Sequence, residues 1–448
     1  MTKISQFAPP SALIRITLVL VLLLTPIGRA ALGQALPAAE ASPVSTGFAL
    51  PTSLGSLQYA VSASQSLTWG YYGNQGAASS TNLTGDVAYL SNSKQHPFSM
   101  VFSGGHSFSE SGQAGYSFLN LGFSQVANLG RWNFILSDNV SYLPGTPFAG
   151  LSGVPGVGDL GVNPVQIGGD TGQGVLTNFS NRVNNVVAGS VQRQITGKTS
   201  LNASGSYATM RFLDSTNGPA SSSGAGLDSD AASGGGGISH QIDARNTYGG
   251  NYAYSNFTYS GNNFGITTPN FVSQTASAMF SHQFTRKLSF SASAGPQWTT
   301  IGSSSSGTSI SAYADVSVSY AAKSYGTSLV FTRGTNSGYG ALAVSISDGV
   351  VFGASRRFGV VWNCSFNSAY AHTSTLAVAS VTPYSVNTAI EGIQVSRAIV
   401  RNLSGYASYA FEDQSNAGTN AINVFSGISQ VVGFGLTYSP SALHLGRQ

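Results

Sequence analysis

The stretch LQYAVSASQSLTWGYY, residues Leu57 to Tyr72, decides the fold because its polarity changes at every residue. Its odd positions, Gln65 apart, are apolar or aromatic, whereas its even positions are mainly Gln, Ser, Thr and Gly. A period of two is typical of a β-strand with one apolar and one polar face. At about 15 residues this strand would be much longer than the usual globular strand of five or six. The stretch therefore predicts a long strand that separates two environments.

The composition fits such strands throughout the chain. Charged residues make up 8% of the 448 residues, against roughly 25% in an ordinary soluble domain. Ser, Thr, Asn and Gln take the place of the missing charges, so polarity alternates along the chain instead of forming separate blocks. Beyond the N-terminal segment no run of 18 or more apolar residues occurs, which excludes membrane-spanning helices.

The N-terminus has the pattern of a secretory signal peptide. Lys3 and Arg15 precede the apolar run ITLVLVLLL at 16–24, and GQA at 33–35 places small residues at the cleavage positions. The apolar run is too short for the roughly 20 residues of a spanning helix. We expect residues 1–35 to be removed on export, which lowers the formal net charge from +4 to about +1 because three cations leave with the segment.

The exported chain offers few features for other classes of function. It has no basic stripe with interleaved aromatics, so a nucleic-acid partner is excluded. Cys364 is the single cysteine, so no disulfide can form within one chain. Because Cys364 alternates with Trp362 and Phe366, we interpret it as an apolar wall position rather than a reactive thiol.

A unit of strand, short basic turn and strand recurs along the chain, for example in SVQRQITGKTSLNASGSYA and MFSHQFTRKLSFSASAG. Gly197-Lys198-Thr199 in the first copy matches the end of a phosphate-binding loop. That loop needs a glycine five residues before the Gly-Lys pair and a helix after it, whereas Gln192 holds the first position and a strand pattern follows. Lys198 is therefore predicted to be a turn cation, not a phosphate ligand. The predicted turn centres are Gly197, Ala244, Arg286, Ala322, Arg356 and Val400, with looser copies at 91–95 and 128–131.

Longer connections rich in Gly, Ser, Pro, Asn and Asp separate these hairpins, the two largest at 143–174 and 214–237. Short turns on one side and long loops on the other are typical of a transmembrane β-barrel. Cations gather in the short turns, and we assign most acids to the long loops, namely Asp159, Asp170, Asp214, Asp228, Asp230, Glu412 and Asp413. Charge then marks the two ends of the strands and leaves their middles nearly bare.

Closure into a ring follows from the cost of unpaired backbone groups in hydrocarbon, which is several kcal/mol each. The sequence predicts an all-β fold, an antiparallel up-and-down barrel of about 16 to 18 strands. The range stays open because residues 340–355 are hard to divide into strand and loop. Aromatic girdles are expected at the strand ends. The alternative, two stacked sheets in a soluble protein, explains neither the strand length nor the scarcity of charge. The girdle candidates are Trp69, Tyr71, Trp132, Trp298, Tyr409 and Phe411.

Several of these segments also point to a family. The recurring alternating strand with a basic turn, as in HQFTRKLSFSASAG and SRRFGVVWNCSFNSAYA, resembles porin-like outer-membrane β-barrels of Gram-negative bacteria, some of them associated with exopolysaccharide secretion. GFGLTY at 433–438 is similar to the C-terminal insertion signal of such barrels, although this chain continues with SPSALHLGRQ. The sequence thus divides into a signal peptide at 1–35, a short periplasmic segment at 36–55, a barrel at 56–438 and a tail at 439–448, and the resemblance covers the barrel.

Candidate sites are few. Residues 156–161 match the letters GxGxxG but lie in a Gly/Pro loop without the flanking strand and helix of a dinucleotide site. The six histidines are scattered, and none is spaced for a metal with another His, Cys or acid. We expect no catalytic residue, no cofactor and no metal.

Four acids are candidate pore residues. By the resemblance, the 143–174 loop would fold into the lumen and place Asp159 and Asp170 near the narrowest point. Asp86 and Asp315 occupy the polar phase of their strands and are predicted to face the lumen.

The function predicted is a passive channel in the cell outer membrane for small hydrophilic solutes, with at most a weak cation preference. Its partners would be outer-membrane lipid and the solutes themselves, and a homo-oligomer stays open. Two alternatives remain: a barrel that exports polysaccharide within a secretion system, and a surface-structural or adhesive barrel. Only about 20 residues separate the cleavage site from the first strand, so we expect no plug domain.

Overall fold

The computed structural model describes residues 55–70, 77–93, 95–109, 115–143, 181–213, 228–260, 270–302, 307–336, 344–376, 384–417, 426–441 and 443–445. The predicted signal peptide, the 36–54 segment, the GxGxxG stretch, Asp159, Asp170 and Asp214 lie outside these residues. Within the described ranges, no helix is long and apolar enough to cross a membrane.

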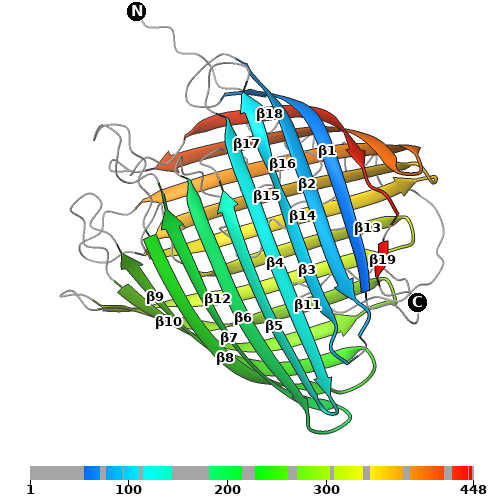
Figure 1. The fold of residues 1–448 in the computed structure, drawn as a ribbon. Coiled ribbons are helices and arrows are strands. Elements are labelled where there is room, and N and C mark those ends of the chain that lie inside the picture. The colour runs from blue at the N-terminus through cyan, green and yellow to red at the C-terminus, as the bar shows by residue number, and fades with distance from the viewer. Residues whose placement is uncertain are drawn as a thin grey trace, which may run out of the picture. The chain divides into compact units, whose positions relative to one another are not determined.

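Strands account for almost all of the described chain (Figure 1). Most are 12 to 16 residues long, as the period-two pattern predicts. They are β1 (Gly55–Trp69), β2 (Ala78–Ser91), β3 (Phe98–Ser109), β4 (Tyr116–Leu129), β5 (Trp132–Leu143), β6 (Arg182–Gln194), β7 (Thr199–Phe212), β8 (Asp228–Gln241), β9 (Asn246–Ser260), β10 (Asn270–Gln283), β11 (Leu288–Gly302), β12 (Gly307–Ala321), β13 (Tyr325–Asn336), β14 (Ser345–Phe358), β15 (Trp362–Thr375), β16 (Ser385–Val400), β17 (Leu403–Ala417), β18 (Gly427–Tyr438) and β19 (Leu443–Leu445).

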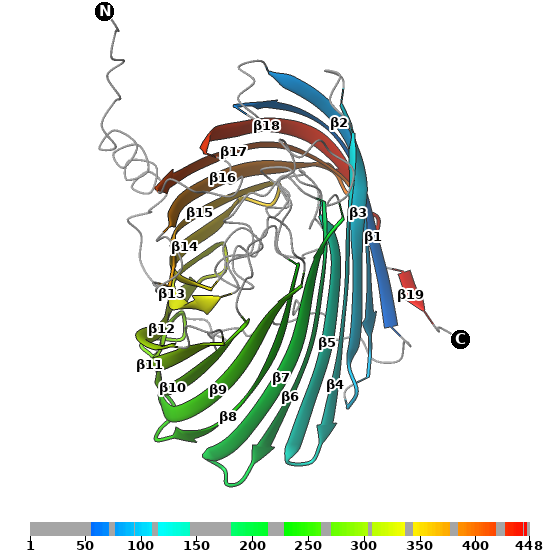
Figure 2. The same cartoon turned by 90° about the vertical axis from the view of Figure 1, so that its left-hand side faces the viewer.

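Antiparallel pairing joins each strand to the next from β1 to β18, and β18 pairs back to β1, from Val61↔Tyr438 to Trp69↔Gln430. Figure 2 shows this wall returning on itself. The three residues of β19 pair with the start of β1. The ring thus has 18 strands, which confirms the all-β up-and-down barrel and lies within the predicted range. Closure pairs the backbone of every wall strand on both sides, as a lipid environment requires.

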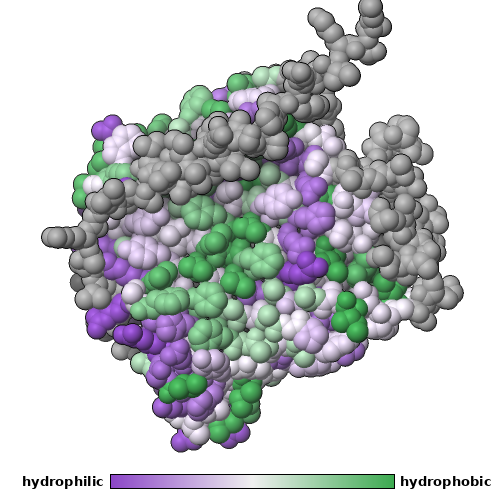
Figure 3. All heavy atoms as spheres, turned by 180° about the vertical axis from the view of Figure 1, so that it is seen from behind, coloured by the Kyte–Doolittle hydropathy of each residue, from purple (hydrophilic) through white to green (hydrophobic). Residues whose placement is uncertain are grey.

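The two faces of the wall differ as the alternation predicts. In β1, Val61 is 54% exposed on one face, whereas Ser62 on the other face is 2% exposed. The exposed face carries large apolar side chains on most strands, including Leu83, Leu136, Leu329 and Phe434. We identify it as the outer face, because the concave inside of a ring shields its side chains. Figure 3 shows hydrophobic residues across the middle of one side of this outer surface.

The short turns follow the predicted hairpins with two shifts. Gly197 to Lys198 lies in the β6–β7 turn, where the Lys198 Nζ donates to the carbonyl of Ile242 at 3.0 Å, so the hairpin interpretation of this motif is confirmed. The predicted centres Arg356 and Val400 are wrong, because both residues still pair in β14 and β16. The β14–β15 turn comes later, where Gly359 has a φ of 62° that favours glycine.

The predicted 214–237 loop is also partly wrong, because β8 begins at Asp228 and includes the run of four glycines. A Cβ on Gly237 would lie 2.6 Å from the carbonyl oxygen of Gly250 on β9, so neighbouring backbone excludes a side chain there. Asp228 and Asp230 therefore lie in a strand. So do Glu412 and Asp413, which belong to β17.

Candidate functional site

The inner face of the wall is a polar surface in which neighbouring strands pair their hydroxyl groups. The Oγ atoms of Ser289 on β11 and Ser319 on β12 lie 2.6 Å apart, and those of Ser291 and Ser317 on the same two strands lie 2.7 Å apart. Ser206 and Ser233 repeat the arrangement at 2.6 Å between β7 and β8. Directly opposed hydroxyls stabilise antiparallel pairs, and they leave few fixed charges on the surface that a solute would meet.

Exposure along this inner face changes from one end of the strands to the other. Near the short turns, inner residues such as Asn202 and Ser204 of β7 are exposed. Near the long connections, the side chains of Thr299, Ser347 and Gln414 also lie on the inner phase, but they are completely buried. The interior is therefore open at the turn side and restricted at the loop side.

One cause of the restriction is the β13–β14 hairpin, whose loop-side end leaves the wall. The β12–β13 ladder stops at Ala314↔Arg333, whereas β13 continues to pair with β14 as far as Asn336↔Ser345. Thr335, two residues beyond Arg333, therefore has no backbone pairing partner on β12. It reaches Gln297 of β11, one strand farther round the ring.

Hydrogen bonds hold the hairpin end against the inner face. The Gln297 side-chain oxygen accepts from the Thr335 backbone N–H and from its hydroxyl, both at 3.1 Å, and the Gln297 amide donates to Ser273 Oγ at 2.9 Å. Thr335 Oγ1 also lies 3.2 Å from Thr299 Oγ1. Gln297 thereby joins β10, β11 and β13 inside the ring.

An apolar cluster beside these hydrogen bonds completes the contact. Phe271 and Ile301 from β10 and β11 pack with Val344 and Leu376, which adjoin β14 and β15, and all four are buried. Phe257 stacks on Phe271 with ring centroids 4.4 Å apart. This buried apolar cluster joins the inner wall to the in-folded strands. No sequence pattern pointed to it, because its members come from separate strand ends.

Five charged residues of the described chain lie on the inner phase of the wall: Asp86, Arg182, Asp315, Arg357 and Glu412. Asp86 is 2% exposed and pairs with Ala60 and Ser103 across β1 and β3. Asp315 is partly exposed and lies opposite Ser293 on β11. Asp86 and Asp315 thus occupy the predicted phase. The sequence interpretation placed Glu412 in a long loop and made no assignment for Arg182.

The outer face also carries charge that the sequence interpretation did not anticipate. Asp138 lies in the middle of β5 among apolar neighbours and accepts a hydrogen bond from Asn185 Nδ2 at 2.7 Å. Nearer the long connections, Arg211 pairs with Asp230 at 2.7 Å, and Arg333 pairs with Asp348 at 2.7 Å. The strand middles are therefore less bare of charge than expected.

The short turns contain one acid among the described residues, Asp243 between β8 and β9. Its carboxylate accepts from the Asn246 side-chain amide at 2.8 Å and from the backbone N–H groups of Arg245 and Asn246. The Asn246 side chain first, and then the backbone donors, lower the pKa of Asp243 below its usual value. Asp243 is a turn-stabilising residue rather than a ligand-binding one.

Four histidine side chains, those of His106, His240, His282 and His372, each make a hydrogen bond to a neighbouring strand, and His96 lies in a turn. His240 Nδ1 lies 2.9 Å from Thr199 Oγ1, and His282 Nδ1 lies 2.7 Å from Asn246 Oδ1, both near the turns. No group of three His, Cys, Asp or Glu residues in the described ranges could hold a metal ion. Cys364 lies on the outer phase of β15 with Trp362 and Phe366.

No protein-family model matches the chain, and no curated protein matches its sequence. Among solved structures it is similar to Pseudomonas aeruginosa OpdQ, at 10% identity and a TM-score of 0.40, over 87% of this chain and 99% of that one. The corresponding values for P. aeruginosa OccK7 (OpdD) are 10%, 0.41, 87% and 99%. For P. aeruginosa OccK2 (OpdF) in complex with glucuronate they are 11%, 0.41, 86% and 97%. Likeness at this level says nothing about what this chain carries, and the barrel rests on the strand pairing described above.

Proposed function

We propose that the chain is a passive channel of the Gram-negative outer membrane for small hydrophilic solutes, acting without a catalytic step. The observation that carries the proposal is the reversal of polarity across the wall: the outer phase is apolar and exposed, and the inner phase is polar. A soluble protein hides its apolar side chains, whereas a barrel in lipid exposes them. A ring of 18 strands is wide enough to enclose water.

The proposed route runs from the open turn side to the restricted loop side. Its narrow part includes the in-folded end of β13–β14, held by Gln297 and the Phe271 cluster. The inner surface offers hydroxyl and amide groups, which suit solutes that exchange hydrogen bonds with water. That Asp159 and Asp170 lie near the narrowest point stays a prediction.

A weak cation preference is part of the proposal. Three acids and two arginines of the described residues lie on the inner phase: Asp86, Asp315, Glu412, Arg182 and Arg357. Two unit charges 4 Å apart in water interact by about 1 kcal/mol. An acid that faces the water of the lumen therefore changes ion passage by about fivefold.

Planar-bilayer recording on the refolded full chain tests the proposal. Steady conductance is expected, with a reversal potential in a KCl gradient that indicates cation preference. The double variant Asp86→Asn and Asp315→Asn should move that potential toward zero, whereas Asp243→Asn, in a turn outside the route, should leave it unchanged. Heat-dependent gel mobility checks that each barrel has folded.

Two outcomes would overturn the proposal in different directions. A folded barrel that never conducts, together with loss of polysaccharide export when the gene is deleted, would favour the secretion alternative. A folded barrel that neither conducts nor supports export, and whose ligand binding disappears on deletion of residues 214–227, would favour an adhesive role.

A further inference from the structure

The short-turn end of the barrel carries a strongly one-sided charge. Eleven Lys and Arg residues of the described chain lie in these turns or in the strand ends beside them, against the single acid Asp243. We call this set the cationic belt. Its members are Arg131, Arg193, Lys198, Arg245, Arg286, Lys287, Lys323, Arg356, Arg357, Arg397 and Arg401.

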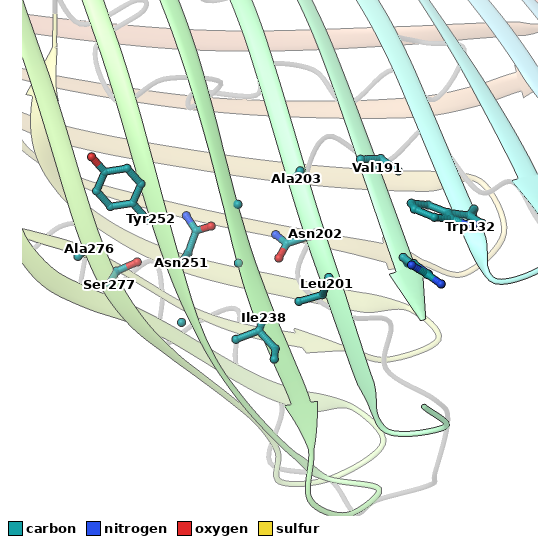
Figure 4. A pocket seen from close by; sticks show the side chains of 14 residues that line it. Trp132, Val191, Leu201, Asn202, Ala203, Ile238, Asn251, Tyr252, Ala276 and Ser277 are labelled. Atoms are coloured by element: carbon teal, nitrogen blue, oxygen red, sulfur yellow. The ribbon is translucent and has the colours of Figure 1, made fainter. Parts of the chain in front are cut away.

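A hollow in the outer face opens beside one part of this belt. It has a volume of about 860 Å³ and crosses β5 to β10 (Figure 4). Its rim is made of large side chains that are exposed on the outer phase, and its floor is made of small residues on adjacent strands. The rim residues are Trp132, Leu201, Ile238 and Tyr252, and the floor residues are Ala203, Gly236, Gly250 and Ala276.

Close backbone approach does not account for the small floor residues. A Cβ on Gly250 would meet its nearest atom, the Ser277 carbonyl oxygen, at 3.8 Å, which is an ordinary contact. At Gly236 the nearest atom would be the Asn202 carbonyl oxygen at 3.3 Å, which requires only a small adjustment. Gly237, on the inner face, contrasts with both, because its Cβ would lie 2.6 Å from backbone. The barrel could therefore be built with larger residues on the floor, and the hollow needs an occupant to fill it.

Arg193 stands at the turn-side end of the hollow, where the interface with water would lie. Its guanidinium lies 4.9 Å from the centroid of the Trp132 ring. No carboxylate of the described residues pairs with Arg193, so its donors remain available. Guanidinium groups bind phosphate in a forked geometry, and Trp residues favour the headgroup level of a membrane.

We propose that the hollow binds one acyl chain of an anionic phospholipid, with the lipid phosphate at Arg193. The chain would lie on the glycine and alanine floor between Leu201, Ile238 and Tyr252, where it restores the contacts that an empty hollow would lose. Three belt residues in the turns beside the hollow, Arg131, Lys198 and Arg245, favour anionic over zwitterionic headgroups at the same level. This inference rests on the membrane position of the proposed function but does not depend on conduction.

A second copy of the chain fits the hollow less well. Small residues do permit close approach of two protein surfaces. Two barrels side by side in one membrane, however, have the same orientation, so their cationic belts would meet at one level. Like charges would face each other there without intervening acids, whereas a phosphate neutralises them.

Native mass spectrometry of the refolded full chain tests the inference. The protein is delipidated in detergent, incubated with an equimolar mixture of phosphatidylglycerol and phosphatidylethanolamine, and scored for retained lipid. The wild type should retain phosphatidylglycerol preferentially. Arg193→Gln should reduce that retention about fivefold, the effect of one cation near an anionic lipid. Gly250→Leu, which fills the floor, should abolish it.

The chain offers a matched control for each variant. Arg397 lies 5.1 Å from the Trp362 ring in the same type of contact, but that pair is outside the hollow. Gly189 faces outward on β6 with its nearest Cβ contact at 3.9 Å and is also outside the hollow. Arg397→Gln and Gly189→Leu should retain lipid as the wild type does.

The inference is overturned if the wild type shows no preference for phosphatidylglycerol, or if Gly250→Leu binds it as before. It is also overturned if Gly250→Leu changes the oligomeric mass instead of the lipid count, since the hollow would then be a subunit contact. Conductance of the same preparations separates the two proposals: lipid retention without conduction contradicts only the channel, and conduction without lipid preference contradicts only the lipid site.

Discussion

Replacing Gln297 by Met tests whether the in-folded β13–β14 hairpin restricts the channel. Met has a similar size and shape, so the change removes hydrogen bonds and leaves little cavity. The variant loses the acceptor for the Thr335 N–H and hydroxyl and the donor to Ser273. The Thr335 hydroxyl keeps its contact with Thr299, so the main loss is the acceptor for the partly buried Thr335 N–H.

An unsatisfied buried donor costs about 1–3 kcal/mol. That cost falls on the in-folded state alone, because a hairpin end released into the water of the lumen can bond to solvent. The population of released hairpin should therefore rise by about 5- to 150-fold. The apolar cluster around Phe271 is unchanged in this variant, so most molecules should keep the hairpin folded in.

Single-channel recording measures this shift. Gln297→Met should show more frequent transitions to a higher conductance level than the wild type, at unchanged reversal potential. Gln192→Met is the control, because Gln192 donates to Ser200 on the inner face near the turns and does not touch the hairpin. If Gln297→Met folds and its conductance histogram matches that of the wild type, the hairpin is not the restriction.

Two further predictions concern the wall and its turns. Leu329→Arg, on the outer phase of β13, should lower the free energy of unfolding in lipid vesicles by about 2–4 kcal/mol. Ser328→Arg, at the adjacent inner position, should lower it much less. Equal losses of stability in urea-dependent unfolding would contradict the assignment of the two faces. The lowered pKa of Asp243 means that its stabilisation of the β8–β9 turn is complete above the unfolded pKa and is lost as the pH falls through the folded pKa. The protection of amides in this turn against exchange, relative to the intrinsic rate at each pH, should therefore fall in acid, and Asp243→Asn should remove that pH dependence.

The fold could be predicted because its physical cause repeats at every second residue. Val61 and Ser62 have opposite environments, and that contrast is written into the sequence of β1 and most later strands. The positions of the turns were harder to predict, because a basic residue such as Arg356 can end a strand as well as occupy a turn. The glycine run of β8 was misread because glycine usually marks loops, whereas here Gly235 and Gly237 permit close approach of the β9 backbone.

The restricted part of the lumen could not be predicted from the sequence. It depends on the β12–β13 ladder ending at Ala314↔Arg333, a matter of register that no local pattern encodes. Gln297 is one of many polar residues on inner phases, and only its position opposite the released end of β13 distinguishes it. Asp138 was missed for a related reason, since a single carboxylate among apolar neighbours does not disturb the alternation around it.

The pairing of β18 with β1 joins the first and the last strand of the wall. Until Gly427 to Tyr438 has been synthesised, both outermost strands keep a row of unsatisfied amides and carbonyls, and nothing earlier in the chain can cover them. A premature stop codon within or before residues 427–438 would thus leave an open sheet that cannot close, however few residues are missing. The ring can therefore close only after β18 has been synthesised.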